Sequence, residues 1–123
     1  MTIQTNLKVT GLELTPALRS YVEEKTLQIG KFVTTTASEN RAEVEIGKTT
    51  EHHRHGEVFK AEINLHTNGK HFYAMATTED LYASLDKVKD EMIRQITSAH
   101  NKEQTLFRRG SRRLKNLFRG WGR

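Results

Sequence analysis

The residues best suited to chemistry are concentrated in the stretch EHHRHGE at residues 51–57. Its three histidines and two glutamates are side chains that zinc accepts as ligands. However, the stretch lies between two segments with strand-like alternation, and no second pair of ligands follows at a recognised zinc spacing. We therefore predict a polar hairpin loop there. Two alternatives are contact with RNA through the histidines and Arg54, and a zinc site.

Two further histidines, His66 and His71, flank the sequence TNGK. Paired histidines suit acid–base chemistry, but no nucleophile motif, glycine-rich phosphate loop or metal triad accompanies them. Glu79 and Asp80 are adjacent carboxylates at the expected start of a helix, where acidic groups offset the helix dipole. The sequence therefore predicts a protein that is not an enzyme and that uses no cofactor, metal or small-molecule substrate.

The net charge of +5 comes from the C-terminal end of the chain. Residues 1–102 contain 13 Lys or Arg and 14 Asp or Glu, whereas residues 103–123 contain 7 and 1. The last 17 residues, FRRGSRRLKNLFRGWGR, hold all seven of those cations. Such an asymmetry indicates a polyanionic partner, either nucleic acid or an anionic membrane surface.

Four segments have the period-two alternation of half-buried strands: residues 2–11, 41–48, 57–67 and 70–77. Asn68 and Gly69 between the last two predict a tight hairpin turn, because both tolerate positive φ. The chain has no cysteine, no leader-like N-terminus and no apolar run long enough to cross a bilayer. We expect a cytoplasmic protein without a transmembrane segment.

A first helix is predicted within residues 14–32. Thr15 is suited to cap it and Pro16 to its first position, while Gly30 is expected to end it. Phe32 is then expected to pack just beyond the end. The apolar positions at helical spacing are Leu18, Tyr21, Val22 and Ile29, and this stripe is interrupted by Lys25 and Thr26.

A second helix is predicted within residues 77–102, with Thr77 or Thr78 as its cap. Its apolar stripe recurs at steps of three or four residues and consists of Leu81, Leu85, Val88, Met92, Ile96 and Ala99. The order β-α-β-β-β-α predicts an α+β fold, a four-stranded mixed sheet with two helices packed on one face. The first crossover makes the first two strands parallel. We expect a domain at 1–102 and a basic, flexible tail at 103–123.

The open face of this sheet would carry acidic side chains and one aromatic, Tyr73, which is poorly suited to stacking RNA bases. The candidate RNA-binding residues are therefore basic positions on the two helices. If the helices lie side by side, these could form one strip: Arg19, Lys25, Lys31, Lys87, Lys89, Arg94 and Lys102. The alternative is a solvated surface with local ion pairs, such as Lys87 with Glu91.

The second helical segment carries Asp80-x-Tyr82-Ala83-x-x-Asp86 followed by Arg94-Gln95. This run resembles the second helix of the ribosome hibernation-promoting factors, also called ribosome-associated inhibitors or ribosomal subunit interface proteins. LTPALRSYVEEK is similar to that family's first helix, and NLHTNGKHFYAMA to its third and fourth strands. The resemblance covers about residues 2–102 and is to the short form of the family.

The resemblance implies a double-stranded-RNA-binding-like fold without catalysis. It implies binding to the small ribosomal subunit and its 16S rRNA in the channel for tRNA and mRNA, which inhibits translation in stationary phase or stress. A small ribosome-dimerising factor is a further possible partner. Arg19, Lys25, Arg94 and Lys102 match basic positions of the family, whereas Glu91, Ser98 and His100 replace expected lysines. The alternatives are a general RNA-binding or RNA-chaperone module and a membrane-surface protein.

The C-terminal segment adds Arg108, Arg109, Arg112 and Arg113 to the candidate rRNA-binding residues. Gly110 and Ser111 are expected to break and cap the chain, after which Leu114, Leu117, Phe118 and Trp121 recur at helical spacing. So short a helix is marginal alone in water. We predict an arm that becomes ordered on RNA and contributes most of the salt dependence of binding.

Overall fold

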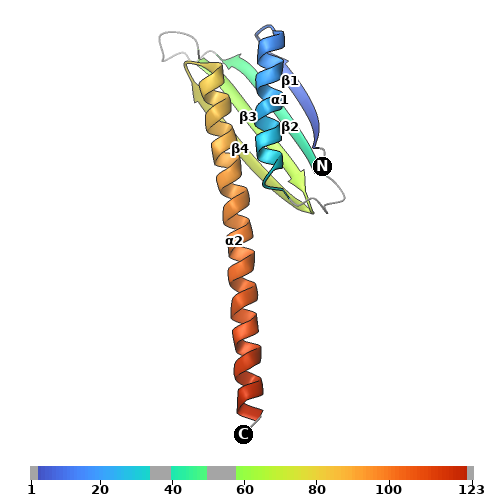
Figure 1. Ribbon diagram of the computed structural model, residues 1–123. Helices are drawn as coiled ribbons and strands as arrows, with labels where there is room; N and C mark the ends of the chain where they lie inside the picture. The colour runs from blue at the N-terminus through green and yellow to red at the C-terminus, as the bar shows by residue number, and fades with distance from the viewer. Residues whose placement is uncertain (1–2, 34–39, 50–57, 122–123) are drawn as a thin grey trace.

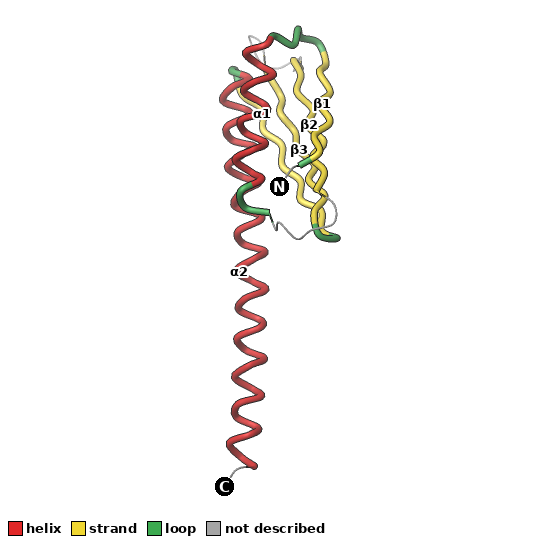
Figure 2. Tube along the Cα trace, turned by 45° about the vertical axis from the view of Figure 1, so that its right-hand side comes forward, coloured by secondary structure: helices red, strands yellow, loops and turns green. Residues whose placement is uncertain are grey.

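The computed structural model describes residues 3–33, 40–49 and 58–121, with side chains described up to Gln104. Its elements follow the order β1 (Gln4–Thr10), α1 (Pro16–Gly30), β2 (Asn40–Thr49), β3 (Val58–Thr67), β4 (Lys70–Thr78) and α2 (Leu81–Trp121). Two layers result, because both helices lie on the same face of the sheet (Figures 1 and 2). The predicted α+β fold and its element order are confirmed.

The sheet has the order β1-β2-β3-β4, with β1 parallel to β2 and the other neighbours antiparallel. Its alternating side chains divide between the helical layer and the open face, as the period of two requires. The inward residues and the helical stripes form one core, to which the following side chains contribute: Val22, Ile29, Val44, Ile46, Ile63, Leu65, Leu85, Val88 and Met92. Burial of such side chains from both layers is the main stabilising term of this fold.

The β3–β4 turn is made by Asn68 and Gly69, with φ of 51° and 74°. Both central residues of this two-residue turn are left-handed, which matches the twist of a hairpin. Thr67 therefore pairs with Lys70, and His66 with His71. The predicted hairpin is confirmed, and its register brings the two histidines directly opposite each other.

Helix α1 begins as predicted, because Thr15 Oγ1 accepts a hydrogen bond from the Leu18 amide at 3.1 Å. Thr26 does not interrupt the buried stripe. It is buried and its hydroxyl donates to the Val22 carbonyl at 2.9 Å, which satisfies the polar group inside the helix. The expected packing of Phe32 is wrong, since this side chain is 51% exposed and the neighbouring Val33 is buried instead.

Helix α2 is capped later than predicted. Asp80 Oδ1 accepts from the Tyr82 amide at 3.2 Å, which makes Asp80 the capping residue. Thr78 instead stabilises the turn before the helix, where its hydroxyl accepts from the Asp80 amide. Ser84 is fully buried and donates to the Phe59 carbonyl at 2.8 Å, so it fixes the start of α2 on β3.

The backbone of α2 continues without a break to Trp121, past the end of the sheet (Figure 1). Lys70, next to the hairpin turn, forms an ion pair with Glu103, which marks where the helix leaves the sheet. We call residues 104–121 the helical extension. The break expected at Gly110 and Ser111 is wrong, because both residues lie within the helix. The helices of the described chain include none that is long and apolar enough to span a membrane.

Candidate nucleic-acid interface

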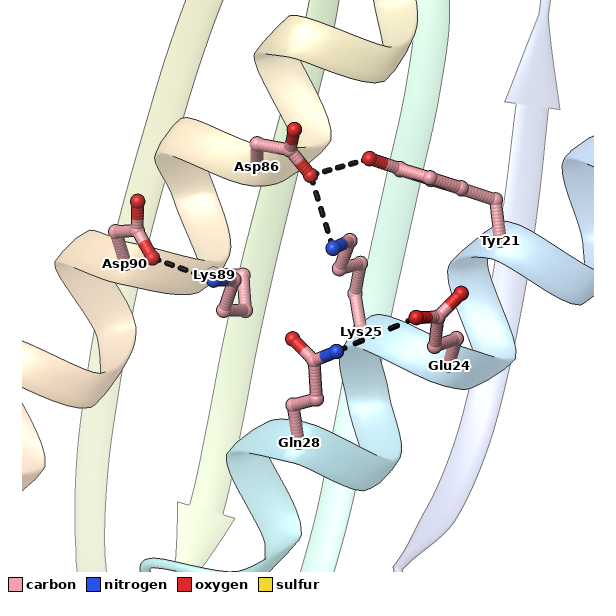
Figure 3. A network of polar contacts seen from close by, with 7 residues as sticks. All are labelled: Tyr21, Glu24, Lys25, Gln28, Asp86, Lys89 and Asp90. Atoms are coloured by element: carbon pink, nitrogen blue, oxygen red, sulfur yellow. Dashed lines mark hydrogen bonds and ion pairs between the residues drawn. The ribbon is translucent and has the colours of Figure 1, made fainter.

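Three side chains connect α1 and α2 across the helical face (Figure 3). The Tyr21 hydroxyl donates to Asp86 Oδ1 at 2.5 Å, and Lys25 Nζ lies 3.1 Å from the same oxygen. The lysine ammonium also lies 4.7 Å from the centre of the Tyr21 ring, a cation–π distance. We call Tyr21, Lys25 and Asp86 the interhelical clamp.

The clamp changes the ionisation of its members. Hydrogen bonds from Tyr21 and then Lys25 lower the pKa of Asp86. The hydrogen bond with Asp86 raises the pKa of Tyr21 and that of Lys25. The side chain of Lys25 is only 12% exposed, whereas that of Asp86 is 46% exposed. Lys25 is therefore a neutralised and largely covered cation, which makes it a residue that positions the helices.

Tyr82 extends the clamp toward solvent. Its ring meets that of Tyr21 edge to face, with centroids 4.8 Å apart, and it is 38% exposed. Edge-to-face contacts between aromatic rings are favourable beyond the area that they bury. Tyr82 therefore adds packing to the polar contacts that hold α1 against α2.

The other basic residues of α2 differ in their partners. Lys89 Nζ lies 2.6 Å from Asp90 Oδ1. Arg94 makes a two-pronged contact with Glu91, at 2.9 Å from Nε and 2.6 Å from Nη2. The pair expected between Lys87 and Glu91 is not formed among the described contacts, because the glutamate binds Arg94 and Gln95 instead.

The Glu91–Arg94 pair makes a prediction about acidity. The hydrogen bond from Arg94, followed by that from Gln95, lowers the pKa of Glu91 to about 2. A carboxyl whose folded pKa is depressed stabilises the fold above its ordinary pKa, and this contribution is lost as the pH falls toward 2. In an Arg94→Gln variant we expect the Glu91 pKa, measured from its carboxyl NMR shift, to move back toward ordinary values. The same titration on Lys89→Gln should leave Glu91 unchanged, and a Glu91 pKa that ignores Arg94 would refute the pairing.

The predicted basic residues do not form a single strip. Glu23 and Leu27 of α1 line a groove with Ile3, next to β1, and Arg19 lies one turn before Glu23 on that side. Gln95 of α2 donates to the Tyr73 carbonyl of β4 at 2.8 Å, so Glu91 and Arg94 belong to the opposite edge. Lys25 lies between the helices. The basic positions that these contacts place therefore lie at both edges of the helical face and between the helices.

Four of these cations are exposed and have no ion pair with another described residue: Arg19, Lys31, Lys87 and Lys102. They can bind phosphate without first losing a partner. Arg108, Arg109, Arg112 and Arg113 have a helical backbone in the extension, but their side chains lie outside the described part. The loop at 51–57 with its possible zinc or RNA contacts also lies outside the described residues.

The open face is acidic at its centre, as expected. Glu45 of β2 and Glu62 of β3 are register partners on that face. The Tyr73 hydroxyl donates to Glu62 at 2.9 Å, and this bond, with burial and the charges of both glutamates, raises the pKa of Tyr73. The described residues contain no group of three potential metal ligands. Glu45 and Glu62 disfavour phosphate contacts at the centre of the sheet.

Sequence reasoning missed the clamp, although it quoted Tyr82 and Asp86 as part of a motif. An exposed-looking aspartate facing Tyr21 and Lys25 can be recognised only once both helices are placed side by side. It also missed the contact between His66 and His71, whose rings stack with centroids 4.6 Å apart. That contact could have been found, because a two-residue turn at 68–69 fixes which residues face each other.

The fold and the distributed cations define a small α+β domain whose helical face is suited to polyanion binding. The chain belongs to the family described as "Sigma 54 modulation protein / S30EA ribosomal protein", which it matches over residues 5–104. It is 32% identical over 110 residues to the "Ribosome hibernation promoting factor" of Azotobacter vinelandii, covering 89% of this chain and 94% of the relative. It is 26% identical over 113 residues to the "Ribosome-associated factor Y" of Haemophilus influenzae, covering 92% and 95%.

The fold is also similar to a solved structure, the N-terminal domain of Protein Y from Thermus thermophilus. The two share 27% identity with a TM-score of 0.62, over 78% of this chain and 96% of that one. The suspected family is confirmed by these similarities. The family match ends at residue 104, so most of the helical extension lies beyond it.

Proposed function

We propose that this protein is a ribosome hibernation factor. It binds the small ribosomal subunit through 16S rRNA, in the channel that tRNA and mRNA use, and inhibits translation in stationary phase or stress. The observation that carries the proposal is the family match over residues 5–104, together with relatives named for ribosome hibernation. The protein acts in the cytoplasm, without catalysis or a cofactor.

The mechanism is steric. Exposed cations of the helical face, such as Arg19, Lys87 and Lys102, contact phosphates and set the orientation of the domain. The clamp fixes the spacing of the helices that carry them. The bound domain then occupies volume that tRNA and mRNA need. Phosphate contacts make the affinity depend steeply on salt, because each contact releases counterions.

Sedimentation with purified subunits tests this proposal. We expect more of the protein to sediment with small subunits than with large subunits. Addition of mRNA and tRNA should displace it from the small subunits. Equal affinity for random structured RNA would favour a general RNA-binding or RNA-chaperone module. Tighter association with anionic vesicles would favour a membrane-surface protein acting through the extension. Absence from the small-subunit fraction even at low salt would refute the proposal.

Ribosome profiles of stationary cells with and without the gene address the partner question. A loss of paired ribosomes on deletion indicates cooperation with a small dimerising factor. Unpaired but inactive ribosomes indicate that the protein silences single ribosomes alone.

A further inference from the structure

One row of side chains crosses the open face of the sheet at the hairpin end. Arg41 of β2 is the register partner of His66 of β3, which in turn is the partner of His71 of β4. The three side chains point away from the helices, because they alternate with inward-facing residues. We call them the cationic row. It places a guanidinium and two imidazoles on three adjacent strands.

The two imidazoles are held in place by their neighbours. Their rings stack with an interplanar angle of 19°. A ring nitrogen of His71 lies 2.9 Å from Asn64 Oδ1, and because that oxygen only accepts, the nitrogen donates. One nitrogen of His71 is thereby occupied, while the stacked pair is presented at an open recess.

The recess has a volume of about 420 Å³ and is polar. Its lining consists of the cationic row together with the turn residues Thr67, Asn68, Gly69 and Lys70. The cationic row supplies the groups of this lining that bind anions, namely a guanidinium and two ring systems that can carry a proton. It contains no carboxylate.

Among the described residues, few charged groups surround the recess. Arg41 Nε lies 3.6 Å from Glu43, which is half exposed, and Lys70 pairs with Glu103 of α2. The next row on the sheet adds Tyr73, whose hydroxyl is bound to Glu62, and β1 contributes the neutral Gln4 opposite Arg41. Each fixed cation thus has an exposed acid beside it. A proton on either imidazole adds positive charge to the recess.

The position of the row distinguishes it from the rest of the open face. The glutamates lie toward the centre of the sheet, and the row lies at the end where α2 passes the hairpin and becomes the helical extension (Figure 1). Positive charge from the row and from the extension is therefore gathered at one end of the molecule.

We propose that the cationic row is a second phosphate-binding site, on the face opposite the helices, and that it takes the phosphodiester group of an RNA strand. The assignment of the RNA to the ribosome rests on the proposed function. A domain with phosphate contacts on both faces is suited to a channel with RNA on two sides. Histidine is the side chain whose charge ordinarily changes between about pH 5 and 8, so binding at this site strengthens as the pH falls.

The test uses a His66→Gln/His71→Gln variant, which keeps two polar, partly exposed side chains. Its affinity for small subunits is measured at about pH 6 and pH 8 at fixed salt. We expect the wild type to gain about three- to tenfold more from acidification than the variant, the effect of one charge-assisted hydrogen bond. At pH 6 the variant should also have a salt slope smaller by about one. His100→Gln, the same change on α2, reports the pH response of a histidine on the helical face, so only a loss specific to the His66→Gln/His71→Gln variant supports the row.

A variant that keeps the wild-type pH ratio and salt slope would overturn the inference while leaving the proposed function intact. If the wild type does not bind small subunits at all, the proposed function fails. The phosphate-binding site is then tested separately, on the protein without ribosomes. Its His66 and His71 ring resonances should shift on addition of a short single-stranded RNA. Shifts with inorganic phosphate and none with RNA would overturn the assignment to RNA.

Discussion

Replacement of Arg108, Arg109, Arg112 and Arg113 by glutamine is expected to lower the affinity for small subunits by on the order of 10²-fold or more at about 0.1 M salt. The segment 103–123 holds seven cations and one acid, so these four residues are most of its charge. Each lost phosphate contact reduces the salt slope by about 0.7 to 0.9. We therefore expect the slope of log affinity against log salt to fall by about 3.

The physical reason is the geometry of α2. The extension continues a helix that is already anchored on the sheet through Glu103 and the core stripe. An anchored helix has no nucleation cost, unlike an isolated peptide of the same length. In the structure the arginines belong to one continuous helix, so we expect little ordering entropy to oppose their binding. Glutamine is a good helix former, so the variant should keep the helical content of the wild type in circular dichroism.

Truncation after Gln104 is the matched control, because it retains the Lys70–Glu103 pair and removes the extension beyond its first residue. If charge is responsible, the glutamine variant should lose more than half of the salt slope that the truncation loses, because it removes four of the seven cations. A large loss of affinity in the truncation, with a normal slope in the glutamine variant, would show that the extension binds through its apolar residues. An unchanged slope in both would exclude the extension from RNA binding.

Most of the fold could be predicted from local patterns, because the physics behind it is local. Alternation fixes which side chains of β2 and β3 face the helices, and Asn68 with Gly69 fixes the hairpin register. The cap of α1 could also be predicted, because the hydrogen bond from Leu18 to Thr15 is local. The cap of α2 could not, since Thr78 and Asp80 both have suitable side chains and only the strand end decides between them.

Helix α2 is longer than the sequence predicts, because Gly110 does not end it. A glycine inside a helix costs about 1 kcal/mol relative to alanine, which is too little to end a helix among good helix formers. A signal was available in the spacing of apolar residues. Leu114 follows Ile96 by 18 residues, which is five turns at about 3.6 residues per turn, so the apolar stripe of the domain and that of the tail are in phase.

The candidate site was less predictable than the fold, because charges are paired by residues distant in sequence. Lys25 appears as an ordinary surface cation until Asp86 is placed beside it. Sequence gives the number of cations on a helix, but only the folded contacts say which of them are free to bind phosphate.

The interhelical clamp gives the second large expected effect, on stability. Substitution of Asp86 should cost more than substitution of Lys25. Asp86→Asn keeps the shape of the side chain but leaves Lys25, at 12% exposed, without its counter-charge. We expect a loss of about 1 to 2 kcal/mol in unfolding free energy by urea denaturation. Lys25→Met should cost less, because Asp86 is 46% exposed and keeps the Tyr21 hydroxyl as donor. Equal costs would contradict this account of the burial of the pair.

The same pair has a defined pH dependence. Because the folded pKa of Asp86 is lowered, its contribution to stability is complete above its ordinary pKa near 4 and is lost as the pH falls through the folded value. The difference in stability between wild type and Asp86→Asn should therefore shrink in denaturation experiments near pH 3. A difference of the same size at pH 7 and pH 3 would assign the effect to packing.

The clamp also separates positioning from phosphate binding at Lys25. A Lys25→Met/Asp86→Leu variant removes both charges at once, so the net charge of the helical face is unchanged. If Lys25 contacts phosphate, the salt slope for small subunits falls by about one. If it positions the helices, the slope stays constant and the affinity changes only as far as the spacing of α1 and α2 changes.

We expect the constant slope, because a cation bound to Asp86 at 3.1 Å and covered by Tyr21 gains little from a phosphate. The cations that determine salt dependence are then those without a partner on the folded domain and those of the extension.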